Sequence, residues 1–117
     1  MDWREIYQLP FTYDDNGGYV WAKNGTMTLT FDFDYDYGER RSIAKNIVEK
    51  LNGNTNIKFD STFSLYDNIY FHYDKEFAFC IRGWGELTAS GCRNLTSEDA
   101  AKVQDDFAKW ILETLNS

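Results

Sequence analysis

Residues 26–36 read Thr-Met-Thr-Leu-Thr-Phe-Asp-Phe-Asp-Tyr-Asp, and polar and apolar side chains alternate along the whole stretch. A period of two places successive side chains on opposite faces of a β-strand, so one face is apolar and the other polar. Asn24-Gly25 comes directly before this stretch, and this dipeptide is the strongest short-range signal for a hairpin. The sequence therefore predicts a strand over residues 19–22 that returns through residues 26–36.

Two amphipathic helices are predicted on the C-terminal side of this hairpin. The first covers residues 39–51, where Ile43, Ile47 and Leu51 recur every four residues on one stripe. The second covers residues 97–115, and Thr96 has the side chain of a good N-cap. Its apolar stripe consists of Ala100, Val103, Phe107, Ile111 and Leu115. A short helical turn is also expected within residues 2–9, ending at Pro10.

Three further strands are expected between the helices, over residues 57–65, 68–73 and 77–82. The predicted order is then β-β-α-β-β-β-α. Hairpins with helices grouped apart from them favour an α+β fold, an antiparallel sheet of about five strands with two helices packed on one face. The length of 117 residues fits a single domain over residues 1–117. No internal repeat is evident at this stage.

The charge balance is acidic, with 12 basic and 19 acidic residues and a formal net charge of −7. Such a surface repels nucleic-acid phosphates and anionic lipids, so we expect no direct nucleic acid and no membrane partner. A basic protein surface or a neutral small ligand is favoured, although the same charge also simply keeps a small domain soluble. No apolar stretch or leader pattern is present, and there are only two cysteines, which predicts a cytoplasmic protein.

Asp32, Asp34 and Asp36 lie on the polar face of the predicted strand. A calcium loop of the EF-hand type would need glycine and glutamate where this chain has Tyr37 and Ile43, so that motif fails. Three readings remain: a solvated or edge-protecting strand face, a contact for a basic protein, or a metal site. We expect no bound metal.

A glycine-rich loop precedes the last helix and contains Arg82, Trp84, Glu86 and Arg93. Its spacing matches neither common phosphate-binding motif, and acidic residues occupy the first turn of the next helix, so nucleotide binding is rejected. Trp84 stands between two glycines. It is either an exposed recognition side chain flanked by arginines or a plug at the end of the core.

Catalytic residue sets are scarce. His72 and Cys80 would lie near each other across one predicted hairpin, and a Cys–His pair is conceivable there. A packed thiol and a surface histidine explain the same residues, so we expect no enzyme activity and no cofactor. The polar face of the sheet would carry Thr28, Thr30, Asp32, Tyr70, His72, Cys80 and Arg82. That composition fits an interaction surface or an ordinary half-exposed sheet.

The C-terminal third carries Ile-Arg-Gly-Trp-Gly-Glu-Leu-Thr at residues 81–88, Asn94-Leu95, and Gln-Asp-Asp-Phe-Ala at residues 104–108. It resembles short uncharacterised proteins of phages and mobile elements of gut bacteria. The resemblance implies a mobile-element origin, and small acidic phage proteins are often inhibitors of host defence, such as anti-CRISPR or anti-restriction proteins. It carries over no catalytic residue.

Three functions follow as hypotheses. The first is a non-enzymatic inhibitor that occupies a basic, nucleic-acid-binding surface of a host protein. Its partner-binding residues would be Asp32, Asp34, Asp36, Arg82, Trp84, Glu86 and Arg93. The second is a small-ligand-binding domain, alone or as an oligomer, that uses Tyr70, Arg82, Trp84 and Arg93. The third is an enzyme built on Cys80 and His72.

Overall fold

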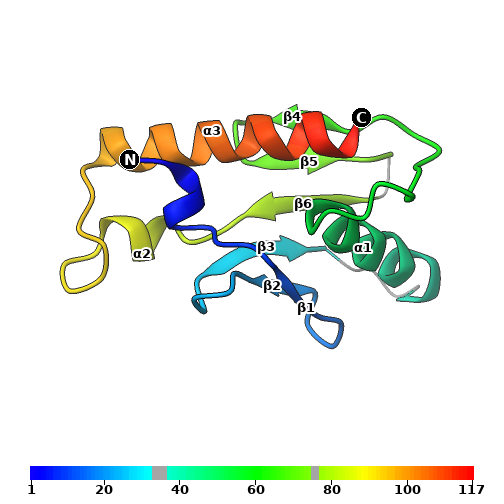
Figure 1. The fold of residues 1–117 in the computed structure, drawn as a ribbon, viewed down its shortest axis with the longest axis horizontal. Coiled ribbons are helices and arrows are strands. Elements are labelled where there is room, and N and C mark those ends of the chain that lie inside the picture. Colours follow the sequence, from blue (N-terminus) through cyan, green and yellow to red (C-terminus); the bar gives the residue numbers. More distant parts are fainter. Residues whose placement is uncertain (33–36, 75–76) are drawn as a thin grey trace.

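The computed structural model describes residues 1–32, 37–74 and 77–117. Six strands in these ranges form one antiparallel sheet in the order β1-β2-β3-β6-β5-β4. The strands are β1 (Thr12–Asp14), β2 (Tyr19–Trp21), β3 (Met27–Phe31), β4 (Ser64–Tyr66), β5 (Tyr70–His72) and β6 (Ala78–Ile81). The helices are η1 (Trp3–Glu5), α1 (Tyr37–Leu51), α2 (Trp84–Thr88) and α3 (Ser97–Leu115) (Figure 1). The predicted α+β class with an antiparallel sheet is confirmed.

Three details of the predicted element order are wrong. β1 was missed because it has three residues, too few to show a period, and turn residues follow it. The strand expected over residues 57–65 is reduced to Ser64–Tyr66, because Phe59 and Phe63 pack their rings on Tyr73. α2 was missed because a glycine lies inside it, and glycine lowers helix propensity.

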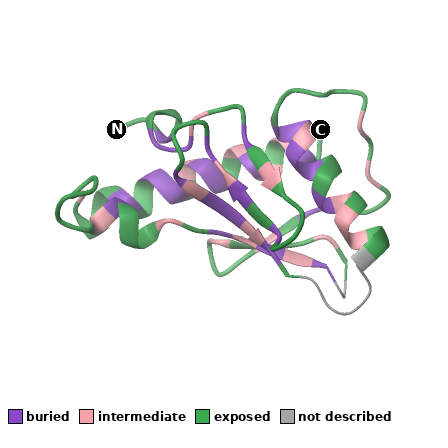
Figure 2. Cartoon of the chain, turned by 90° about the horizontal axis from the view of Figure 1, so that it is seen from below, coloured by how far each residue is buried: buried purple, intermediate pink, exposed green. Residues whose placement is uncertain are grey.

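One face of the sheet is covered and the other is open. Leu29, Phe31, Phe79 and Ile81 are buried, while Thr30 and Cys80 between them are partly exposed. Thr28, which was predicted for the exposed polar face, is instead fully buried, and its hydroxyl donates to Thr26 O at 3.0 Å. The helices η1, α1 and α3 pack on the buried side (Figures 1 and 2). Phe107 of α3 contacts Trp3, Tyr7 and Phe11, which ties the N-terminal segment to this helix. Both predicted amphipathic helices therefore cover the same face.

The sheet consists of two similar halves. In each half a three-stranded meander is followed by a helix: β1-β2-β3-α1, then β4-β5-β6 with α2 and α3. The pairing registers match as well. Asp14 pairs with Tyr19 and Tyr19 with Thr30, as Tyr66 pairs with Tyr70 and Tyr70 with Cys80. The central pair Thr30–Cys80 is the centre of an approximate twofold axis normal to the sheet.

The two halves also share sequence, so the expectation of no internal repeat is wrong. Ile-Val-Glu-Lys-Leu-Asn at residues 47–52 corresponds to Ile-Leu-Glu-Thr-Leu-Asn at residues 111–116. Each asparagine follows its helix and clamps the residue before the first strand of its own half. The side-chain amide of Asn52 accepts from Phe11 N at 2.7 Å and donates to Phe11 O at 2.8 Å. Asn116 makes the same pair of bonds with Phe63, at 2.8 and 2.9 Å.

None of the described helices is long and apolar enough to cross a membrane.

Candidate functional site

The uncovered side of the sheet carries a row of aromatic side chains. We call this surface the open face and define it by Tyr19, Thr30, Tyr66, Tyr70, His72, Cys80 and Arg82. Tyr66, Tyr70 and Tyr19 are 61%, 43% and 37% exposed, which is high for tyrosines within strands. Tyrosine is enriched in protein interfaces because its ring buries apolar area while its hydroxyl finds a polar partner.

The predicted acidic row is described only in part. Asp32 follows β3 and is exposed, and its backbone N–H donates to Ala78 O at 3.3 Å. Asp34 and Asp36 lie outside the described residues, so the fold neither supports nor contradicts their predicted role. Asp32 is on the same side of the sheet as Arg82, since each is two residues beyond a member of the Thr30–Cys80 pair.

Arg82, Trp84, Glu86 and Arg93 gather at one end of the central strands. Arg82 is exposed and its Nε donates to Thr30 Oγ1 at 3.1 Å, which lays the guanidinium along the open face. Trp84 begins α2 and is 42% exposed, so it is not the plug of the core. With Met27, Arg82 and Glu86 it lines a hollow of about 500 Å³.

A buried tyrosine holds this end of the sheet in place. Tyr7 Oη donates to the backbone carbonyl of Arg82 at 2.9 Å and accepts from Gln104 Nε2 at 3.4 Å. Burial raises the pKa of Tyr7 to about 12. The next residue, Gly83, has φ of +96°, and a Cβ there would lie 3.0 Å from Met27 O. The start of α2 therefore requires glycine at this position.

The segment after α2 folds back on it. Leu95 N donates to Leu87 O at 2.7 Å, and Leu87 is fully buried. Arg93 Nη2 donates to Thr26 Oγ1 at 3.4 Å, across to the β2–β3 turn. Arg93 and Glu86 line a second hollow of about 480 Å³ beside Thr26 and Cys92. Hydrogen bonds thus hold the glycine-rich loop in place, and it presents Trp84 and two arginines on the surface.

The fold separates Asp32 from the Trp84 loop. Asp32 lies beside Ala78, four residues along β6 from Arg82, which corresponds to about 13 Å. In the twofold arrangement Asp32 and Arg82 occupy equivalent places, since each follows the third strand of its half. The two connections that the sequence singled out therefore leave opposite ends of the sheet, with opposite charge.

His72 and Cys80 share the open face, as the predicted hairpin implied. Cys80 pairs with Tyr70 across the two strands, and His72 lies two residues beyond Tyr70 on the same face. Burial is the main cause that raises the pKa of the Cys80 thiol, which disfavours the nucleophilic thiolate. His72 instead packs its ring edge-on against Tyr66, with centroids 5.9 Å apart. Within the described ranges, no three His, Cys, Asp or Glu side chains are grouped so that they would hold a metal ion.

Sequence reasoning missed two of the three exposed tyrosines. Tyr19 was placed on a strand but not assigned a face, and Tyr66 lies just beyond the strand predicted to end at residue 65. The strand register would have identified Tyr66, because it pairs directly with Tyr70, which the alternating pattern places on the polar face. Without the turn at Asp67 and Asn68, both with positive φ, that register was not fixed.

Comparison with protein-family models, with curated proteins and with solved structures finds no match to this chain.

Proposed function

We propose that this chain is a non-enzymatic binding protein that docks the open face and the neighbouring Trp84 loop onto a basic protein surface. The observation that carries the proposal is the exposure of Tyr19, Tyr66 and Tyr70, which lie in one row of paired residues across an otherwise well-packed sheet. Exposed aromatic groups of this kind are costly to hydrate and gain most from burial against a partner.

The charge around the open face supports a basic partner. Asp14 pairs with Tyr19, Asp67 follows Tyr66, and Asp32 closes the far end, all of them exposed. Arg82 is the basic group that these described strands contribute to the face. The chain as a whole carries −7, so long-range attraction favours a positively charged surface.

The partner that fits this chemistry best is a protein whose basic surface handles nucleic acid. The resemblance to phage and mobile-element proteins supports an inhibitor of a host defence protein, of the anti-CRISPR or anti-restriction kind, that acts in the cytoplasm. Two free cysteines are in keeping with a reducing compartment.

Affinity capture from a lysate of the source organism tests the proposal. The wild-type chain is compared with a Tyr66→Ser, Tyr70→Ser double variant and with Lys102→Ser, which changes an exposed residue of α3 on the other side. We expect one basic, nucleic-acid-handling protein to bind the wild type and Lys102→Ser, to be lost with the double variant, and to be released by salt. Equal capture by the double variant, or no capture by any bait, would contradict the proposal.

A small-ligand-binding function is the alternative, and the hollow lined by Arg82, Trp84 and Glu86 favours it. Its volume of about 500 Å³ is in the range of ligand pockets. In that case Trp84→Ala removes a ligand-induced rise in melting temperature, while Tyr66→Ser leaves it unchanged. If no metabolite or nucleotide in a library raises the melting temperature of the wild type or of Tyr66→Ser, this alternative is excluded.

A further inference from the structure

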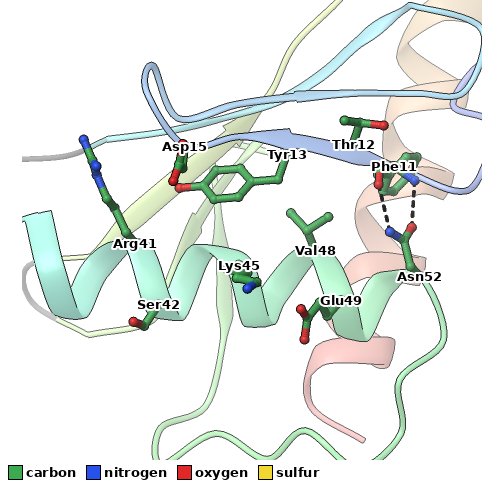
Figure 3. A pocket seen from close by; sticks show the side chains of 10 residues that line it. All are labelled: Phe11, Thr12, Tyr13, Asp15, Arg41, Ser42, Lys45, Val48, Glu49 and Asn52. Atoms are coloured by element: carbon green, nitrogen blue, oxygen red, sulfur yellow. Dashed lines mark hydrogen bonds between the residues drawn. The ribbon is translucent and has the colours of Figure 1, made fainter.

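A groove separates the edge strand β1 from helix α1, on the opposite side of the sheet from the open face. Its volume is about 670 Å³. Phe11, Thr12, Tyr13 and Asp15 form the strand wall, and Arg41, Ser42, Lys45, Val48, Glu49 and Asn52 form the helix wall (Figure 3). β1 is the first strand in the sheet order, so its outer side has no strand neighbour among the described residues.

The backbone of Tyr13 faces this groove. The N–H and C=O of Phe11 point outward, since both bond to the side chain of Asn52, the residue after α1 (Figure 3). Backbone groups alternate in direction along a strand, so those of Tyr13, two residues on, point outward as well. Asp14 faces the other way, and its carbonyl accepts from Gly18 N at 3.0 Å, beside β2.

Asn52 already occupies the place of an adjacent strand. Its amide gives Phe11 one acceptor and one donor, as a paired residue of an antiparallel neighbour would. An incoming strand therefore meets Tyr13 as its first free pairing position and ends against Asn52. Antiparallel to β1, it runs in the same direction as α1 and has its C-terminal end at Asn52 (Figure 3).

The charges on the helix wall define the side chain that fits opposite Tyr13. Paired residues on neighbouring strands point to the same face of a sheet. The Tyr13 ring points to the helix side, and its centroid is 5.7 Å from that of the buried Phe31 ring. The incoming side chain therefore points to the same side, toward α1. Lys45 lies at the middle of the groove there and is exposed, with Val48 and Glu49 one turn further along (Figure 3). Asp15 and Arg41 line the far end of the groove.

We propose that the β1–α1 groove binds an extended peptide segment of a partner protein, which adds as an antiparallel strand to β1 and places an acidic side chain opposite Tyr13, against Lys45. Addition of a strand to a sheet edge uses main-chain hydrogen bonds for affinity and alternate side chains for specificity. This binding site is independent of the open face, so either can exist without the other.

NMR titration of the ¹⁵N-labelled chain tests this inference with the end-blocked peptide Thr-Val-Glu-Val-Thr. We expect shifts of the Tyr13, Asp15 and Lys45 amides, saturating at millimolar peptide. Lys45→Glu should weaken binding about fivefold or more, and a peptide with lysine at the centre should recover it with that variant. Lys109→Glu on α3 is the matched control and leaves the affinity unchanged.

A second peptide, N-methylated at its central glutamate, separates strand addition from charge attraction alone. It cannot donate to Tyr13 O, so we expect its binding to be lost. Equal binding of the N-methylated peptide would overturn the inference, as would shifts confined to the open face or the absence of any shift at Tyr13 and α1 with millimolar unmodified peptide.

Discussion

Gly83 shows how one residue fixes the place of the Trp84 loop. Its φ of +96° lies in the left-handed region, and an added Cβ would sit 3.0 Å from the backbone oxygen of Met27. We predict that Gly83→Ala lowers the free energy of unfolding by about 1–2 kcal/mol or more in urea denaturation. Gly85→Ala is the control: it has no atom within 4 Å of the new Cβ and should be neutral or slightly stabilising. Equal stability of Gly83→Ala and wild type would refute this role.

Tyr7 links pH to stability. Burial of its hydroxyl raises its pKa from about 10 when unfolded to about 12 when folded. The folded state therefore holds this proton more tightly. Its stabilising effect is complete below pH 10 and is lost as pH rises through 12.

We predict that thermal unfolding of the wild type loses stability between pH 10 and 12, and that Tyr7→Phe shows a smaller loss. At neutral pH, Tyr7→Phe should cost about 1–3 kcal/mol, because the Arg82 carbonyl and Gln104 lose their partner. Tyr66→Phe, at an exposed site, should match the wild type. A Tyr7→Phe protein with unchanged stability and the full alkaline loss would contradict the assignment.

At the scale of elements, the two asparagine clamps make a prediction that the repeat requires. Asn52→Ala should release the Phe11 amide, and Asn116→Ala the Phe63 amide, each at a cost of about 1–2 kcal/mol. Hydrogen exchange measured by NMR should show faster exchange of only the clamped amide and its own half of the sheet edge. Asn46→Ala, on the exposed side of α1, is the control and should change neither. Faster exchange of both the Phe11 and the Phe63 amide in either variant would mean that the two halves do not act separately.

The sequence predicted those elements whose periodicity was long enough to read. The residues 97–115 expected for the last helix match α3, and Thr96 Oγ1 accepts from Asp99 N at 3.1 Å as an N-cap should. The hairpin at Asn24-Gly25 is also confirmed, with Gly25 at φ of +87°. β1, which was not predicted, and β4, which is shorter than expected, have three residues each, and at that length pairing, not local pattern, decides the structure.

The candidate site was predicted only in part, for a related reason. Arg82 and Tyr70 were placed on the polar face correctly, since β6 and the strand at Tyr70 alternate clearly. That Arg82, Trp84, Glu86 and Arg93 gather at one end depends on contacts from distant parts of the chain. The Tyr7–Arg82 and Thr26–Arg93 bonds join residues that no local pattern relates.

In the whole molecule, the approximate twofold symmetry of the two halves explains the arrangement of the surfaces. Two βββα halves bury their strands beneath α1 and α3, and this leaves a common open face crossed by the related pair Tyr19 and Tyr70. The halves differ most in the connection after the third strand. In the second half, residues 82–96 form a hydrogen-bonded loop that contains α2. The binding function that we propose combines the shared face with this added loop.

Oxidative footprinting of exposed side chains shows whether the open face and the Trp84 loop are covered by a partner. The tagged chain is oxidised in lysate of the source organism at low and at high salt, and in buffer alone, with Leu9 as the internal reference because its 40% exposure matches that of Tyr70 and Trp84. We predict that Tyr66, Tyr70 and Trp84 are protected relative to Leu9 in low-salt lysate and become reactive again at high salt. Equal reactivity of these three residues in lysate and in buffer would contradict it.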